Sequence, residues 1–138
     1  MKLELHLNLP PRDCSPNRRG SSISHAKGIA EYRRETCYTA MSVKHRTCPN
    51  WQPCKVRISY TFLTHTTPLT KDRYRPQDLD NCRGSLKSAI DGLKDAHIIP
   101  DDTAEFVTWG DEALYVRESL SPKYIGKPRV ILEIEERA

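Results

Sequence analysis

Carboxylate side chains in the second half of the sequence are spaced in a way that suits a divalent cation. Asp78 and Asp80 lie two residues apart, and Asp101 and Asp102 follow a break at Pro100. In an extended segment, residues two apart point to the same side, so Asp78 and Asp80 would face one pocket. Mg²⁺ prefers octahedral oxygen ligands and keeps several waters. The pattern therefore predicts a magnesium site that could also take Mn²⁺, and it leaves open whether one ion or two would bind.

A lysine near these acids extends the predicted chemistry to phosphate esters. A divalent ion neutralises neighbouring carboxylates and lowers the pKa of its bound water, which can then act as a nucleophile. Lys87 lies seven residues after Asp80, and seven steps along a continuous helix return to nearly the same face. Its ammonium group could then stabilise negative charge on a scissile phosphate. The alternatives are that Asp80 or Asn81 only caps a helix and that Lys87 is an ordinary exposed side chain.

Hydrophobic periodicity predicts the elements that would position these groups. Alternating apolar residues are typical of half-buried strands, and apolar residues every three or four positions are typical of amphipathic helices. Ser24 would cap the first helix, and Pro100 would end the second. The order β-α-β-α-β-β predicts one α+β domain over residues 1–138, a mixed sheet of about four strands packed with two helices. We expect strands near residues 3–9, 55–62, 106–109 and 130–134, helices over about 25–45 and 80–96, and a stripe of Ile29, Tyr32, Thr36, Cys37 and Ala40 on the first helix.

Charge is divided unevenly along the chain. Residues 1–75 carry 14 Lys and Arg against 5 Asp and Glu, whereas residues 76–138 carry 8 against 13. A basic half suits a polyanion such as DNA, and an acidic half suits a cation; the simpler alternative is a solvated surface with uneven charge. Trp51 and Trp109 could stack on unpaired bases or pack in the core. The basic residues that we expect to contact DNA are Arg18, Arg19, Lys27, Arg73 and Arg75.

The remaining features favour a globular protein of the cytosol. With 37% hydrophobic and 29% charged residues, the composition is typical of a folded domain and not of a disordered chain. No apolar run approaches the ~20 residues that span a bilayer, and the N-terminus lacks a secretory signal pattern. The five cysteines have no CxxC spacing and are expected to be reduced. Their spacing matches no common zinc-ligand pattern, but the residue types of a zinc site are present in Cys37, His45, Cys48 and Cys54.

Taken together, the acidic and lysine motifs resemble the RusA family of Holliday junction resolvases, which occurs in phages, prophages and bacteria. The similarity covers residues 75–107: an acidic DxDN, a helical lysine, an aspartate–small residue–leucine step at 91–93, a short apolar turn and a double aspartate. Weaker support comes from the Ser-Pro-Asn loop at 15–17. The resemblance implies that Mg²⁺ binds Asp78, Asp80 and Asp102 and that Lys87 assists; additional candidates beside these acids are Asn81 and Asp101.

The resemblance further implies an intertwined homodimer that makes paired nicks in opposed strands of a four-way DNA junction, in recombination and repair, with a 3′ oxygen as the leaving group. One feature departs from the family. In its founding member the lysine follows the second acid by four residues, and here it follows by seven. Both spacings return to one helical face. Arg83 is an alternative residue for the role of the lysine. The competing hypotheses are a branched-DNA-binding protein with weak or no activity and a small regulatory or structural phage protein with incidental acids.

Overall fold

The computed structural model describes residues 1–16, 20, 22–64, 79–116 and 128–137. The predicted order of strands and helices is confirmed, except that the second helix is divided in two. The elements are β1 (Lys2–Leu7), the short 3-10 helix η1 (Arg12–Cys14), α1 (Ser22–Thr47), β2 (Val56–Thr64), α2 (Leu79–Ser85), α3 (Lys87–Asp95), β3 (Val107–Val116) and β4 (Arg129–Glu136). Five predicted site residues lie outside the described residues, namely Arg18, Arg19, Arg73, Arg75 and Asp78.

The four described strands form one mixed sheet in the order β1-β4-β2-β3, which confirms the predicted α+β class. β4 pairs antiparallel with β1 and β2, whereas β3 joins the edge of the sheet parallel to β2. The alternation along β1 buries Leu3, Leu5 and Leu7 and leaves the residues between them exposed. This is the pattern of a sheet with one face against a core and one face in solvent.

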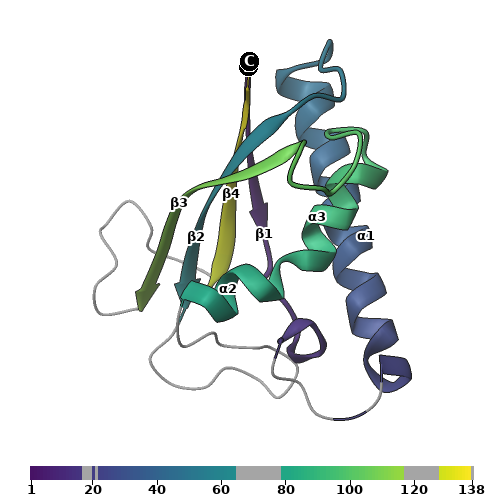
Figure 1. Ribbon diagram of the computed structural model, residues 1–138, viewed down its shortest axis with the longest axis vertical. Coiled ribbons are helices and arrows are strands. Elements are labelled where there is room, and N and C mark those ends of the chain that lie inside the picture. Colours follow the sequence, from purple (N-terminus) through teal and green to yellow (C-terminus); the bar gives the residue numbers. More distant parts are fainter. Residues whose placement is uncertain (17–19, 21, 65–78, 117–127, 138) are drawn as a thin grey trace.

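Helix α1 runs beside the sheet (Figure 1) and packs against β1 and α3. The predicted stripe is confirmed: Tyr32, Thr36 and Ala40 are buried, and Ile29 and Cys37 pack against the core. The predicted cap at Ser24 is wrong, because α1 already begins at Ser22. Two residues before the helix, Gly20 has a φ of 99°, in the left-handed region that glycine adopts at little cost. None of the described helices combines the length and apolar character needed to cross a membrane.

The continuous helix predicted over 80–96 is wrong, because the chain breaks between α2 and α3 at Leu86 (φ −91°, ψ 3°). Two local interactions accompany the break. The Ser85 hydroxyl donates to the Cys82 carbonyl (2.8 Å), and the Leu86 amide donates to the Arg83 carbonyl (3.1 Å), which tightens the last turn of α2 to 3-10 spacing. Leu86 itself is fully buried in the core. Lys87 is therefore the first residue of a new helix and not a point on the same helical face as Asp80.

Candidate metal and nucleic-acid site

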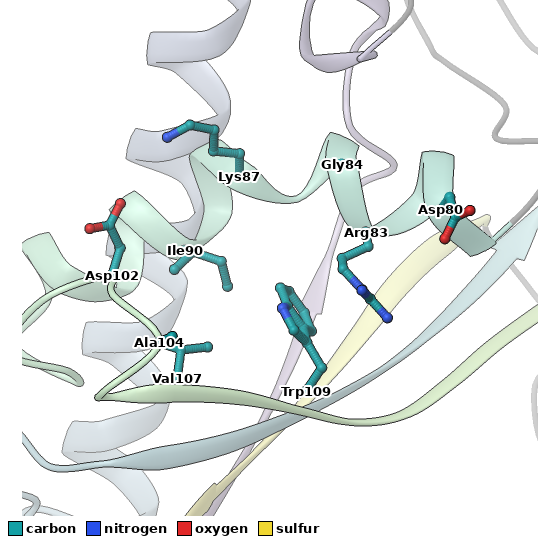
Figure 2. A pocket seen from close by; sticks show the side chains of 9 residues that line it. All are labelled: Asp80, Arg83, Gly84, Lys87, Ile90, Asp102, Ala104, Val107 and Trp109. Atoms are coloured by element: carbon teal, nitrogen blue, oxygen red, sulfur yellow. The ribbon is translucent and has the colours of Figure 1, made fainter.

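A pocket of about 560 Å³ opens between α2, α3, the turn after α3 and the edge strand β3 (Figure 2). Charged side chains and apolar side chains both contribute to its wall. The residues that line it are Asp80, Arg83, Gly84, Lys87, Ile90, Asp102, Ala104, Val107 and Trp109. Three residues predicted as catalytic therefore share one pocket, although they come from three separate segments.

The three predicted residues do not form a tight cluster. Asp80 lies in the first turn of α2, Lys87 begins α3, and Asp102 is in the turn after α3. Figure 2 shows Asp80 at one end of the pocket beside Arg83, and Asp102 at the opposite end on the side of Lys87. Within the described ranges, no group of three or more His, Cys, Asp or Glu side chains is placed to hold a metal ion. Asp78, the predicted partner of Asp80, lies outside these ranges.

Asp91 is a neighbour of the site that the sequence prediction did not include. Burial raises the pKa of the Asp91 carboxyl group, Lys87 opposes that rise, and a hydrogen bond with the Asp102 carboxyl group adds to it. Asp91 lies four residues after Lys87 on α3, a spacing that brings two side chains together on one helical face. The only sequence signal for this residue was its place in the aspartate–small residue–leucine step. Asp91 does not itself line the pocket, but it adjoins Asp102 and Lys87, which do.

The two additional candidates, Asp101 and Asn81, are not among the pocket residues. The Asp101 carboxylate accepts the backbone N–H of Asp102 (2.8 Å) and lies 3.2 Å from the Lys94 ammonium group. The hydrogen bond from the Asp102 backbone and the contact with Lys94 both lower the pKa of Asp101. Its carboxylate is therefore engaged on the other side of the turn, while its neighbour Asp102 faces the pocket.

An arginine and a tryptophan form the wall between the two ends of the pocket. The Arg83 guanidinium group bonds to Glu112, which raises the pKa of Arg83, and lies over the Trp109 ring at 5.7 Å from its centroid. The Tyr60 ring meets the Trp109 ring edge to face, with centroids 5.7 Å apart. Such aromatic and cation–π contacts favour one orientation of the indole.

A β-bulge in β3 makes this arrangement possible. Trp109 pairs with Ile58 and Glu112 pairs with Tyr60, so β3 has one residue more than β2 over this stretch. Residues two apart normally share a face; with one residue inserted, positions 109 and 112 share it. A side chain at Gly110 would collide with Ser59, which explains the glycine. The bulge therefore brings Glu112 to the side where Arg83 and Trp109 meet.

The two tryptophans lie in different surroundings. Trp51 is 3% exposed and its Nε1 donates to the Ile98 carbonyl (3.0 Å), so for Trp51 the core alternative is correct. Trp109 is only partly buried and lines the pocket. Sequence alone could not separate these two residues, because their burial depends on which segments pack against them.

The predicted DNA-contacting residues are mostly outside the described ranges. Lys27 is described: it is on α1, its side chain is 88% exposed, and it lies 4.0 Å from Glu31 one turn later. The four residues considered above as zinc ligands do not share a site either. The Cys37 thiol contacts Met41, whereas the Cys48 thiol donates to the Lys2 carbonyl.

Comparison with known proteins adds no assignment. No protein-family model matches the chain, and no curated protein matches it. The resemblance to RusA resolvases thus rests on the motif residues themselves, and the function has to be inferred from the pocket.

Proposed function

We propose that this protein is a Mg²⁺-dependent endodeoxyribonuclease of the RusA type that nicks branched DNA such as four-way junctions. The observation that supports this most is the convergence of Asp80, Lys87 and Asp102 on one pocket, although they come from different elements. Aspartates that only cap helices would not be expected to line one pocket together with a lysine and an arginine.

The donors in the pocket fit a hard divalent cation. Burial does most to raise the pKa of the Asp91 carboxyl group, and the hydrogen bond and the charge of the neighbouring Asp102 add to that rise. A cation between the two carboxyl groups would relieve their repulsion. At the other end Asp80 is exposed and would act with Asp78. A bound Mg²⁺ ion would supply an activated water and stabilise charge on the phosphate. In this proposal Asp102 and Asp80 are the principal ligands, and Asp91 supports Asp102.

The cationic side chains would hold the DNA strand. Lys87 lies toward the Asp102 end of the pocket (Figure 2), where its ammonium group would contact a non-bridging oxygen of the scissile phosphate and stabilise the charge that develops on it. Arg83 is half-exposed although it is bonded to Glu112, so it can also contact a neighbouring phosphate. A homodimer with two such pockets, as the resemblance implies, would place one nick in each of two opposed strands.

A second function is favoured by one specific observation. Asp80 and Asp102 lie at opposite ends of the pocket (Figure 2), which is the separation expected if this chain binds branched DNA but turns over slowly or not at all. Such a protein would keep the basic residues and the pocket and position a metal poorly.

The two functions are separated by measuring binding and cleavage on the same DNA. Wild type and Asp80→Asn are compared on a labelled four-way junction, with binding measured in EDTA and cleavage in Mg²⁺ or Mn²⁺. For a nuclease we expect Asp80→Asn to lose cleavage by about 100-fold or more, as for loss of a group that stabilises the transition state, while binding stays within about threefold. Tight binding by wild type without nicks in either metal would establish the binding protein instead.

A further inference from the structure

We propose that Trp109 is a specificity-determining residue: it is the platform on which a nucleobase, displaced from its stack, lies while the backbone of that strand occupies the charged part of the pocket. This inference rests on the proposed function and adds to it the feature of DNA that the pocket selects. The substrate class is DNA with an unstacked base at the cleavage point, as at a branch.

The first observation is the mixed chemistry of the pocket wall. Phosphate and metal chemistry would use Asp80, Lys87 and Asp102, but Ile90, Val107 and Trp109 contribute an apolar surface to the same pocket. Figure 2 shows the indole standing between Arg83 and Ile90. The volume of about 560 Å³ lies within the range of sites that hold organic ligands. An aromatic base next to its own phosphate matches both parts of this wall.

The second observation is that the indole is held in place before any ligand binds. Tyr60 contacts its edge, and Arg83 lies over it while bonded to Glu112. Tyr60 is itself fixed, because its hydroxyl donates to the Leu79 carbonyl at the start of α2 (3.0 Å). A platform that is already oriented loses little conformational entropy on binding. Stacking on such a ring accepts any base, because every base has a π-face.

This arrangement predicts discrimination by structure and not by sequence. In a continuous duplex each base is stacked and paired, so presenting one to Trp109 would cost unstacking energy. At a branch point or in a single strand that cost is smaller, so the pocket would favour such DNA over linear duplex. Arg83, beside the indole, would contact the adjacent phosphate without reading the base.

The test uses the full chain in EDTA, so that binding is measured apart from cleavage. Wild type, Trp109→Leu and Trp109→Phe are titrated with a four-way junction and with a linear duplex of the same sequence. We expect Trp109→Leu to bind the junction about 5- to 150-fold more weakly, the range for loss of one base–aromatic stack, with duplex binding unchanged. Trp109→Phe should keep most of the junction affinity. A 2-aminopurine at the branch point should be quenched by wild type and not by Trp109→Leu.

The contrary results are distinct from failure of the proposed function. If Trp109→Leu weakens binding to the junction and to the duplex equally, Trp109 is a structural residue and the inference is overturned. The inference is also overturned if Trp109→Leu binds and nicks junctions like wild type. In the latter case the nuclease proposal stands. If wild type itself shows no preference for the junction over the duplex, both the inference and the proposed function fail.

Discussion

Replacing Gly92 with alanine tests how the packing of α3 on α1 positions the site. Gly92 is buried in α3, where a Cβ atom would lie 2.5 Å from the Arg33 carbonyl oxygen, 2.9 Å from the Thr36 Cβ and 3.1 Å from the Cys37 nitrogen. Two of these three atoms are backbone atoms of α1, so they cannot rotate away. The only relief is for α3 to move off α1, and α3 carries both Lys87 and Asp91.

The expected change in the free energy of unfolding is the sum of two opposing contributions. Overpacking of a well-packed core costs about 1–3 kcal/mol, and three contacts below ordinary van der Waals distance place this site in the upper half of that range. Replacing a helical glycine by alanine returns about 1 kcal/mol of helix propensity. The net expectation is that the free energy of unfolding falls by about 1–2 kcal/mol. For a domain of this length that corresponds to a Tm lower by about 3–8 °C.

The assay is thermal unfolding followed by circular dichroism, with Gly84→Ala as the matched control. The three atoms nearest to a Cβ atom at Gly84 would belong to the ring of Pro16, at 3.0–3.5 Å, so we expect the Tm of Gly84→Ala to stay within about 3 °C of wild type. Junction cleavage by Gly92→Ala should fall as well, since α3 is displaced. A Tm for Gly92→Ala equal to or above that of wild type would refute the close helix contact and the account of how α3 is held.

Two further predictions concern stability. Asp91→Asn should raise the Tm at neutral pH, because burial raises the pKa of this carboxyl group more than Lys87 lowers it, so the folded chain disfavours the ionised form. The gain in Tm over wild type should vanish as the pH falls towards the ordinary carboxyl pKa of about 3.9. A gain that grows on acidification would contradict a raised pKa. Trp51→Phe should lower the free energy of unfolding, measured in urea, by about 1–2 kcal/mol, because the hydrogen bond to the Ile98 carbonyl is lost. An unchanged free energy of unfolding would mean that this hydrogen bond does not stabilise the fold.

Much of the fold could be predicted from the sequence, because its elements have clear periodicity. The alternation of Leu3, Leu5 and Leu7 specifies a half-buried strand, and the spacing of Tyr32, Thr36 and Ala40 specifies the buried side of α1. The break at Leu86 could not be predicted in this way, because the residues around it keep a helical apolar period on both sides. It arises from local hydrogen bonds of Ser85 and Leu86 and from burial of the leucine.

The candidate site was predictable in its residue types and less so in its geometry. Asp80, Lys87 and Asp102 could be selected because hard oxygen donors and an ammonium group suit phosphate chemistry. The pairing of Asp91 with Asp102 depends on where the turn after α3 places the second aspartate, and nothing in the local pattern reports that. The place of Glu112, which bonds to the Arg83 that lies over Trp109, depends on a bulge opposite Ser59, which is a property of two strands and not of one.

The measurement that tests the central claim most directly compares two neighbouring aspartates. Asp102→Asn and Asp101→Asn make the same chemical change one residue apart, but only Asp102 lines the pocket, whereas Asp101 faces Lys94. Single-turnover nicking of a labelled four-way junction in Mg²⁺ is measured beside wild type, with a linear duplex as the substrate control. The proposal predicts nicks by wild type on the junction, a loss of about 100-fold or more for Asp102→Asn, and a rate within about threefold of wild type for Asp101→Asn. Equal rates for Asp102→Asn and wild type, or no nicking by wild type in Mg²⁺ or Mn²⁺, would contradict it.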